Sequence, residues 1–297
     1  MRDGVIIVNK GEGISSQGAV TRVKRIFGVS KAGHTGTLDP LATGVLPVLV
    51  GRGVKASEFM LTSDKHYRAT LLLGVTTDTE DVTGNILTEC GDIPGEDRVL
   101  DCISSFVGES MQIPPMYSAL KVGGRKLCDI ARAGGTVERE ARAITVYSID
   151  AKGLTEREYS LDIKCSKGTY IRTLCADIGA ALGCGGTMKT LCRMSAGGFG
   201  LDEAHTLEEL EAMTEAEREG VIVPTEVIFK DKRRVVLADF FARLARCGAP
   251  VYLRKIGLEA EPSELVRLCD KNGFFALGEV RDTDEGRAIK PIRQFDV

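Results

Sequence analysis

The sequence predicts an α+β fold: a large domain with a mixed, mostly antiparallel sheet flanked by helices, followed by a small β-rich domain. The length of 297 residues is typical of about two domains. Strand-like and helix-like patterns interleave without the regular spacing of βαβ units, which favours α+β over a parallel sheet. Short β-like runs dominate after about residue 228, so we expect domains at 1–228 and 229–297.

The N-terminal elements are predicted to be a strand and a capped helix. Val5–Val8 is a short apolar run rich in β-branched residues, which predicts a buried strand. Ser15 or Ser16 can cap a helix over residues 17–27 that ends at Gly28. The other face of this helix carries three basic residues, Arg22, Lys24 and Arg25. They form either a solvated surface or a surface that contacts phosphates.

The remaining elements are predicted from periodicity. Apolar or alternating runs predict strands over Tyr67–Leu73, Ala143–Ile149 and Tyr159–Cys165. Helical spacing predicts helices over Arg98–Phe106, Tyr170–Leu182 and Thr206–Met213. In the small domain, β-like runs with little helix between them lie at Val235–Leu237, Leu265–Leu268, Phe274–Val280 and Ala288–Ile292.

The net charge of the chain conceals a strong segregation of charge. The 39 Lys and Arg against 42 Asp and Glu leave −3, which by itself is not typical of a nucleic-acid binder. Residues 1–70 and 121–200 each carry +5, whereas residues 71–120 carry −8 and residues 201–297 carry −5. Because the local field governs what a surface attracts, two basic blocks remain available for a polyanion.

Composition and spacing exclude several classes of protein. No stretch approaches the roughly 18 consecutive apolar residues of a membrane span, and the apolar run near the N-terminus is too short for a signal peptide. The nine cysteines include no C-x-x-C pair, and the three histidines have no metal-ligand spacing. An odd number of cysteines without a signal peptide predicts reduced thiols in a cytoplasmic protein that holds no structural metal.

The densest group of unusual residues lies between Gly33 and Pro47, GHTGTLDPLATGVLP. Asp39 precedes Pro40, which pushes its backbone toward extended geometry. An aspartate on such a constrained loop is either a catalytic carboxylate or the start of an Asx turn that satisfies local backbone donors. The glycine-rich phosphate-binding patterns and the G-x-S-x-G nucleophile elbow are absent, which argues against kinases, dehydrogenases and hydrolases.

This segment, GHTGTLDPLATGVLPV, resembles the catalytic motif of the TruB family of tRNA pseudouridine synthases. Further segments resemble that family in the same order along the chain: VNKGEGISSQ, DKHYRATLLLGVTTDTEDVTG, IPPMYSALKVGGRKLCDIARAG, REARAITVY and CSKGTYIRTLCADIGAALGCG. The resemblance covers residues 4–200 closely and the tail more loosely. A G-T-L-D alone is weak evidence, whereas ordered segments of this length are specific.

The resemblance implies an enzyme that isomerises uridine 55 in the T loop of tRNA to pseudouridine, without a cofactor or a metal. Asp39 matches the essential carboxylate of the family, which acts as a nucleophile on the uracil ring or on C1′, or as a base at C2′. Arg172, in GTYIRT, matches the residue that pairs with this aspartate. Such a cation is expected to orient the carboxylate and to lower its pKa.

Five further positions match substrate-contacting residues of the family. Tyr67, in KHYRA, matches the tyrosine that stacks on the target base and assists proton removal at C5. Tyr170 matches a second tyrosine, and Leu191 matches an apolar pocket residue. His34 matches the histidine that inserts into the T loop, and Lys10 matches a basic position near the active site. Without the resemblance, each would be interpreted as an ordinary packing or surface residue.

The resemblance also implies how the RNA is bound. Residues 113–135 resemble an inserted loop that closes on the RNA, and residues 229–297 resemble a small PUA-like RNA-binding domain. The acidic balance over 201–297 argues against a large contribution from that domain. A base inside a folded loop must be flipped out to react, and it is then stacked on an aromatic side chain.

The expected partner is the T-arm stem-loop of tRNA. The protein is expected to be a cytoplasmic monomer, with no membrane association and no obligatory protein partner. Two alternatives remain: a non-catalytic RNA-binding protein that keeps the fold, and an enzyme of the related guide-RNA-directed branch, which depends on partner proteins. The carboxylate at Asp39 argues against the first, because a binder gains nothing from a negative charge facing a polyanion.

Overall fold

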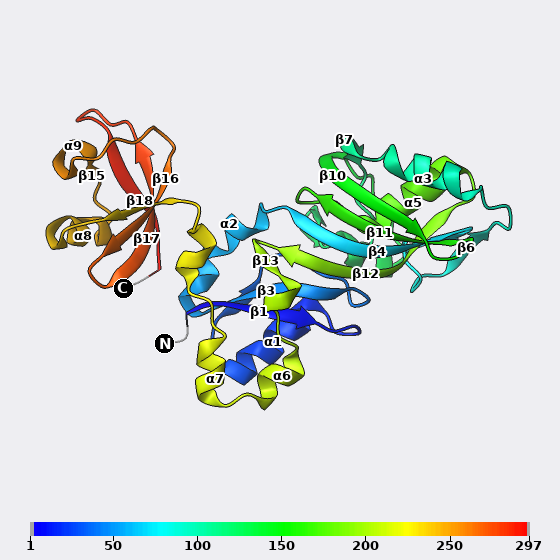
Figure 1. Cartoon of the computed structure of the whole chain (residues 1–297), viewed down its shortest axis with the longest axis horizontal. Helices are drawn as coiled ribbons and strands as arrows, with labels where there is room; N and C mark the ends of the chain where they lie inside the picture. Colours follow the sequence, from blue (N-terminus) through cyan, green and yellow to red (C-terminus); the bar gives the residue numbers. More distant parts are fainter. Residues whose placement is uncertain (1–2, 296–297) are drawn as a thin grey trace.

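The computed structural model describes residues 3–295 and contains two main sheets, formed by different parts of the chain (Figure 1). A nine-stranded sheet with helices makes up the large domain, and a five-stranded sheet lies at the C-terminal end. The predicted α+β class is therefore confirmed. No helix within residues 3–295 is long and apolar enough to cross a membrane.

The large sheet is mixed and mostly antiparallel, as predicted. The order of its main path is β1 (Gly4–Lys10), β3 (Thr43–Val50), β12 (Gly186–Ala196), β4 (Lys65–Leu73), β11 (Glu158–Cys165), β10 (Arg142–Gly153) and β7 (Gly108–Gln112). Two short strands pair at its side, β2 (Ala32–His34) with β3 and β13 (Phe199–Gly200) with β12. Within this sheet, β3 and β12 run parallel and the other pairs are antiparallel.

Three helices bury their apolar faces against this sheet: α1 (Ser16–Phe27), α3 (Glu96–Ser104) and α5 (Ile171–Leu182). The ends of α1 lie where the sequence predicts them. The Ser15 side chain accepts a hydrogen bond from the amide of Gly18 at 3.0 Å, and Gly28 closes the helix with φ of 63°. The acidic helices α6 (Leu207–Ala212) and α7 (Glu215–Gly220) follow the last strands of the sheet.

The basic face of α1 is bound by the protein itself. Arg22 forms ion pairs with Glu208 at 2.7 Å and with Glu211 at 2.6 Å, and Arg25 pairs with Glu211 at 2.7 Å. The sequence left two alternatives for this face, a solvated surface or a surface that contacts phosphates. Neither describes these two arginines, because their charges join α1 to α6. The pairing has no signal in the sequence, since the partners come from opposite ends of the large domain.

Two long strands of the large sheet, β3 and β12, are absent from the prediction. Thr43–Val50 forms β3, for which the sequence predicts no element; nearly all of it is buried, so it lacks an alternating pattern. Gly186–Ala196 forms β12, which was not predicted. Its pairing with β4 shifts register twice, between Met188 and Thr190 and between Arg193 and Ser195, and each shift interrupts the alternation of side chains.

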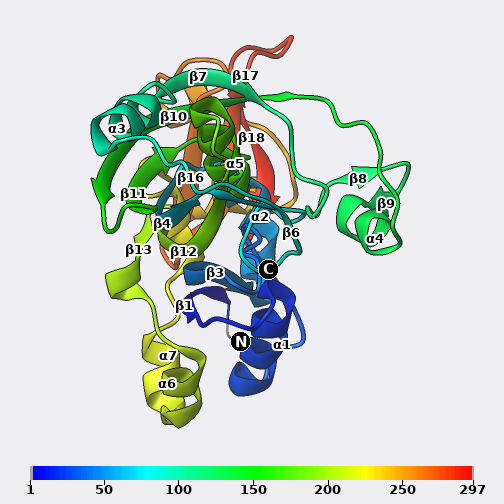
Figure 2. The same cartoon turned by 90° about the vertical axis from the view of Figure 1, so that its right-hand side faces the viewer.

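Short elements connect the parts of the large domain. A separate hairpin consists of β5 (Val75–Thr77) and β6 (Ile86–Glu89). Residues 113–135 contain the hairpin β8 (Lys121–Val122) and β9 (Arg125–Lys126) and the helix α4 (Leu127–Arg132), and they stand away from the large sheet (Figure 2). The other short helices are Gly51–Ala56, α2 (Ser57–Leu61), Leu201–Glu203 and Thr225–Phe229.

The C-terminal sheet has the order β14 (Arg233–Val236), β16 (Leu265–Asp270), β17 (Gly273–Arg281), β18 (Ala288–Gln294) and β15 (Val251–Tyr252). The prediction of little helix here is wrong for α8 (Asp239–Arg246), and a second short helix is α9 (Leu253–Ile256). Phe229 joins this sheet to the large domain. Its ring lies 5.3 Å from that of Phe59 in α2 and 5.9 Å from that of Phe274 in β17.

Candidate active site

A cavity of about 330 Å³ lies where the loop before β3 meets the ends of β4, β12 and α5. Its walls come from residues 35–39, residues 117–120, residues 166–172, Leu61 of α2 and the facing side chains of β4 and β12. Asp39, Tyr67, Tyr170, Arg172 and Leu191 all line it. The cavity therefore brings together five of the seven site residues named from the sequence.

Asp39 lies on a loop that hydrogen bonds hold to the start of α1. The hydroxyl of Ser16 accepts a hydrogen bond from the amide of Leu38 at 2.8 Å and donates one to the carbonyl of Leu38 at 2.9 Å. The carbonyl of Asp39 accepts from the amide of Ala42 at 3.1 Å. Its carboxylate, with 35% of the side chain exposed, therefore faces the cavity from a rigid support.

Arg172 in the first turn of α5 binds this carboxylate. Its Nε lies 3.0 Å from Oδ2 of Asp39, and only 5% of its side chain is exposed. Its two terminal nitrogens donate to the carbonyl of Thr79 at 2.9 Å and to the carbonyl of Tyr117 at 2.8 Å. With all three nitrogens engaged, the guanidinium has a fixed orientation toward Asp39.

A second carboxylate, Asp81, shares the same arginine. Its Oδ2 lies 3.5 Å from Nη1 of Arg172, and 6% of its side chain is exposed. Its Oδ1 accepts from the hydroxyl of Thr79 at 2.9 Å and from the amide of Thr83 at 3.0 Å. Asp81 was missed in the sequence because it is one of three acidic residues in the polar loop TTDTED, and nothing local distinguishes it.

The pKa of Asp39 corrects the expectation from the sequence. Burial raises the pKa of this carboxyl above its ordinary value, and the nearby charge of Asp81 raises it further. Arg172 lowers the pKa, as expected, but its effect is smaller than that of burial. Arg172 therefore orients Asp39 while the cavity makes ionisation of the carboxyl harder than in water.

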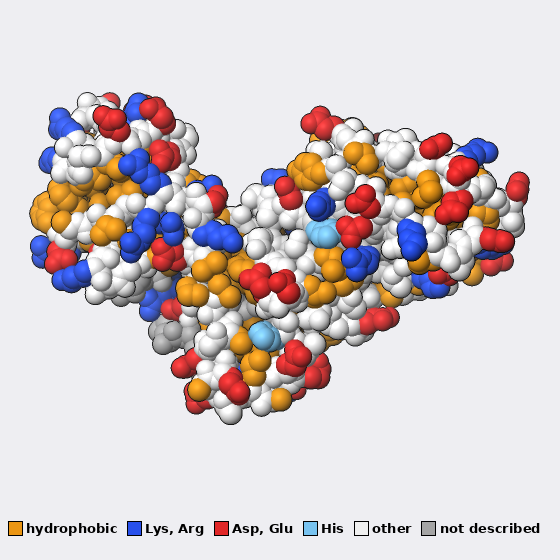
Figure 3. Space-filling model, viewed as in Figure 1, with side chains coloured by type: hydrophobic (Ala, Val, Ile, Leu, Met, Phe, Trp, Pro, Cys, Tyr) orange, Lys and Arg blue, Asp and Glu red, His pale blue; other side chains and the backbone are white. Residues whose placement is uncertain are grey.

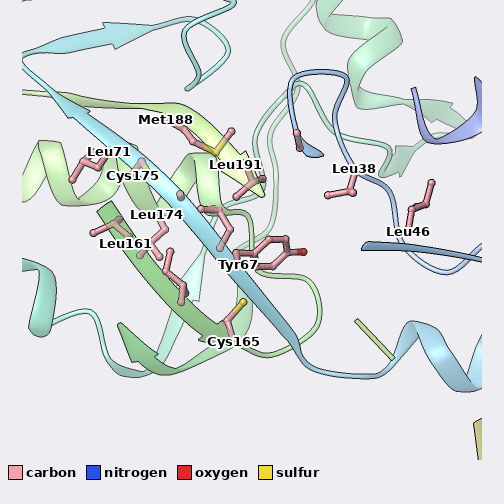
Figure 4. Close-up of a cluster of buried hydrophobic side chains, with 14 of the residues drawn as sticks. Leu38, Leu46, Tyr67, Leu71, Leu161, Cys165, Leu174, Cys175, Met188 and Leu191 are labelled. Carbon is pink, nitrogen blue, oxygen red and sulfur yellow. The ribbon is translucent and has the colours of Figure 1, made fainter. Parts of the chain in front are cut away.

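Tyr67 and Leu191 form the apolar wall of the cavity. Figure 4 shows both among the buried side chains, with the Tyr67 ring directed toward the loop that carries Leu38. Each has 8% of its surface exposed. Burial raises the pKa of the phenols of Tyr67 and Tyr170, so both are neutral near pH 7.

Arg193 is a further site residue that the sequence did not reveal. It is the register partner of Tyr67 across β12 and β4, and it is 1% exposed. Its guanidinium donates to the carbonyls of Val45 at 2.7 Å, Gly36 at 3.2 Å and Thr37 at 3.5 Å, which ties the Asp39 loop to the sheet. An unbroken alternation in β12 would have indicated an inward-facing arginine, but the bulges conceal it.

Gly44 shows how closely β3 and β12 approach at this point. Its φ is 99°, and a Cβ at this position would lie 2.3 Å from the carbonyl oxygen of Arg193. A side chain here would be strained by its backbone and would also push β3 away from β12. Gly44 is therefore required to seat Arg193 beneath the Asp39 loop.

Lys10 and His34 do not line the cavity in this structure. Lys10 is fully buried, and its Nζ donates to the carbonyls of Gly11 and Ile14 at 2.8 Å each and of Pro40 at 3.4 Å. Burial lowers the pKa of Lys10 to about 8. His34 is partly buried in β2, and its Nδ1 accepts from the amide of Gly36 at 3.4 Å.

The described residues offer no obvious metal centre. Within residues 3–295, no group of three or more His, Cys, Asp or Glu side chains is placed to hold a metal ion. The charged side chains that line the cavity are instead one carboxylate, two arginines and one lysine, and three tyrosines also line it.

The chain is similar to proteins of known family along most of its length. Residues 24–171 match the family model described as TruB family pseudouridylate synthase, N-terminal domain, and residues 172–230 match the tRNA pseudouridylate synthase B C-terminal domain. The tRNA pseudouridine synthase B of Alkaliphilus oremlandii is 40% identical over 295 residues, covering 98% of each chain. That of Nitrosococcus oceani is 42% identical over 297 residues, covering 98% of this chain and 94% of the relative.

A solved structure also has this fold. A chain in the crystal structure of a Cbf5–Nop10–Gar1 complex matches with a TM-score of 0.73 and 27% identity, over 99% of this chain and 85% of the other.

Proposed function

The chain belongs to the TruB family of pseudouridylate synthases, and we propose that it isomerises uridine 55 in the T loop of tRNA to pseudouridine with Asp39 as the reacting carboxylate. The observation that carries the proposal is the pair of Asp39 and Arg172 in the wall of a cavity large enough for one nucleotide. A protein that only binds RNA has no use for a carboxylate held in this way against a polyanion.

The reaction conserves all atoms and electrons of the uridine. The N1–C1′ bond breaks and a C5–C1′ bond forms, while C5 loses its proton and N1 gains one. Asp39 in its ionised form can attack the uracil ring or C1′, or can remove the C2′ proton. Arg172 supports each of these roles because it holds the carboxylate in one orientation and stabilises its charge in a partly buried site.

Access to C1′ requires the target nucleotide to leave the loop of the RNA. Tyr67 and Leu191 present a flat, apolar wall on which the flipped uracil can stack, and Tyr170 faces the same space. His34, outside the cavity, takes the place of the displaced base in the T loop. Lys10 supports the Asp39 loop through its bond to the carbonyl of Pro40, rather than touching the RNA itself.

Two parts of the chain hold the rest of the tRNA. Residues 113–135 close on the T arm from the projecting hairpin and α4, which carry Lys121, Arg125, Lys126 and Arg132. The C-terminal domain binds RNA more strongly than its acidic surroundings suggest. Residues 201–228 hold one Arg against nine Asp and Glu, whereas residues 229–297 hold fourteen Lys and Arg against eleven Asp and Glu.

This division of charge is visible on the surface. In Figure 3, acidic side chains dominate the end formed by α6 and α7, whereas basic side chains are frequent on the C-terminal domain. The acidic balance over 201–297 thus comes from the large domain, and the domain boundary after residue 228 separates it from a weakly basic RNA-binding module.

We assign a stand-alone enzyme, active as a cytoplasmic monomer without a protein partner or cofactor. The relatives named tRNA pseudouridine synthase B are about 40% identical over nearly the whole chain, compared with 27% for the protein from the Cbf5–Nop10–Gar1 complex. The projecting segment 113–135 also provides an RNA-closing element within the chain itself.

The test is conversion of uridine in a T-arm stem-loop by the purified protein, with no added protein or guide RNA. We expect stoichiometric pseudouridine from the wild type and none from Asp39→Asn, which should still bind the RNA. Turnover by Asp39→Asn near the wild-type rate would remove Asp39 from the chemistry. A wild type that needs a guide RNA would assign the chain to the other branch.

A further inference from the structure

The hydroxyl of Ser118 is a buried polar group without a partner in the wall of the active-site cavity. Ser118 is 5% exposed, and its Oγ forms no hydrogen bond among the residues that the structure describes. The phenol of Tyr170 lies near enough for the Ser118 hydroxyl to oppose the rise in the pKa of Tyr170 that burial causes, but no hydrogen bond of normal geometry joins the two. A buried hydroxyl without a partner destabilises a fold, so its presence calls for an explanation.

The backbone around Ser118 is fixed on both sides, so the hydroxyl has a defined position. The carbonyl of Tyr117 accepts a hydrogen bond from Arg172 at 2.8 Å. The carbonyl of Ser118 accepts one from the amide of Cys128 in α4 at 3.1 Å, and its own amide donates to the carbonyl of Met116 at 2.9 Å. These contacts tie Ser118 to the catalytic arginine and to the projecting segment.

Several other polar side chains around the cavity already have partners within the protein. Arg172 and Arg193 donate to carboxylates or backbone carbonyls, as described above. Ser166 accepts from the amide of Thr145 at 2.9 Å, and Thr169 donates to the carbonyl of Ser166 at 3.0 Å. The two other buried side-chain atoms without a partner in residues 3–295, Nε of Arg139 and Nε of Arg293, do not line this cavity.

We propose that Ser118 contacts the substrate: its hydroxyl forms a hydrogen bond with the flipped target nucleotide, which supplies the partner that the protein lacks. This inference rests on the proposed function. A hydroxyl both donates and accepts, so it fits the exocyclic oxygens of uracil and the 2′-hydroxyl of the ribose. Flipped bases and their sugars are held by hydrogen bonds of this kind together with stacking on aromatic side chains.

The first readout is stability without RNA. Ser118→Ala removes a hydroxyl that has no partner, so its Tm should equal or exceed that of the wild type. Ser166→Ala, the matched control in the same cavity, removes a hydroxyl that is already bonded and should lower Tm. A clear loss of Tm in Ser118→Ala would show that the hydroxyl has a partner within the protein, and it would overturn the proposal.

The second readout is a set of double-mutant cycles between protein and RNA. Binding is measured in the Asp39→Asn background with T-arm stem-loops that carry uridine, 2-thiouridine, 4-thiouridine or 2′-deoxyuridine at the target position. Ser118→Ala should weaken binding of the uridine stem-loop by about 3- to 10-fold, as expected for one neutral hydrogen bond. One of the three analogues should show no further loss, because the group that Ser118 contacts is already altered.

The position of that analogue identifies the contacted group as O2, O4 or the 2′-hydroxyl. In Ser166→Ala, all three analogues should retain their full wild-type penalties. If the loss of affinity caused by Ser118→Ala adds to the loss caused by every one of the three analogues, Ser118 does not contact the nucleotide. That outcome differs from a failure of the proposed function, in which the wild type would not convert the uridine stem-loop at all.

Discussion

Arg172 lies between two carboxylates: its Nη1 is 3.5 Å from Oδ2 of Asp81, while its Nε is 3.0 Å from Oδ2 of Asp39. One buried cation therefore stabilises both the reacting carboxylate and a second, almost fully buried one. Asp81 has opposing effects on Asp39, since it helps to fix Arg172 but also raises the pKa of Asp39 through its own charge.

Asp81→Asn should shift the pH dependence of the reaction. Removal of a like charge lowers the pKa of Asp39, so the acidic limb of kcat/KM should move to lower pH. The rate on the plateau should fall, because Arg172 loses an anchor. The measurement is kcat/KM on a T-arm stem-loop against pH. Asp78→Asn, an exposed residue of the same loop, should leave the limb in place. An acidic limb at higher pH in Asp81→Asn would contradict this account.

Arg172→Ala should abolish turnover and also destabilise the protein. It leaves two carboxylates without their cation, which typically costs about 3 kcal/mol for buried pairs. Without Arg172, the pKa of Asp39 rises further, so protonation of Asp39 as the pH falls removes part of the cost of its uncompensated charge. The loss of unfolding free energy relative to wild type should therefore be smaller at pH 5 than at pH 8. Denaturant titrations at the two pH values test this, and an equal loss at both would be inconsistent with it.

Arg193→Met should destabilise the protein by about 2 to 4 kcal/mol, because three backbone carbonyls lose a charged donor in the interior. Turnover should fall as well, since Arg193 ties the Asp39 loop to β12. Arg68→Met is the matched control on the neighbouring strand. Arg68 is exposed and pairs with Asp162 at 3.4 Å, so the change should be small. Equal unfolding free energies for the two variants would refute the role of Arg193.

Lys10 should give the stability of the protein a measurable dependence on alkaline pH. Its pKa is lowered to about 8 in the folded protein, compared with 10.5 for the ordinary side chain. Between these values the unfolded chain binds the extra proton, so the contribution of Lys10 to stability rises with pH, by about 3 kcal/mol in total. The unfolding free energy of wild type minus that of Lys10→Met should increase from pH 8 to pH 10.5. If this difference in unfolding free energy does not change with pH, Lys10 is not desolvated.

The C-terminal domain should add affinity for full-length tRNA and not for the isolated T arm. We expect the triple variant Arg243→Gln, Arg254→Gln and Lys255→Gln, at exposed positions, to weaken tRNA binding and to reduce its salt dependence. Binding of the stem-loop should not change. Lys152→Gln, exposed on β10, serves as the control. If the triple variant also loses affinity for the stem-loop, these residues contact the T arm itself, which would contradict the prediction.

The sequence by itself determined much of this protein. Local signals located the strand at Val5–Val8, both ends of α1 and the strand at Tyr67–Leu73, because caps, glycine and periodicity act within a few residues. The ordered motifs named Asp39 and Arg172 as partners, and the structure places them 3.0 Å apart.

Tertiary structure alone decided the surroundings of that pair. Three residues of the site come from parts of the chain that only the fold brings together: Asp81, Arg193 and Ser118. The strand order places β12 between β3 and β4, and residues 117–118 pack on α5. No local pattern in the sequence encodes this strand order or this contact. Burial, which also depends on the whole fold, reversed the expected direction of the pKa shift of Asp39 and turned Lys10 inward. Sequence patterns report neighbours along the chain, whereas solvation and charge at a site depend on neighbours in space.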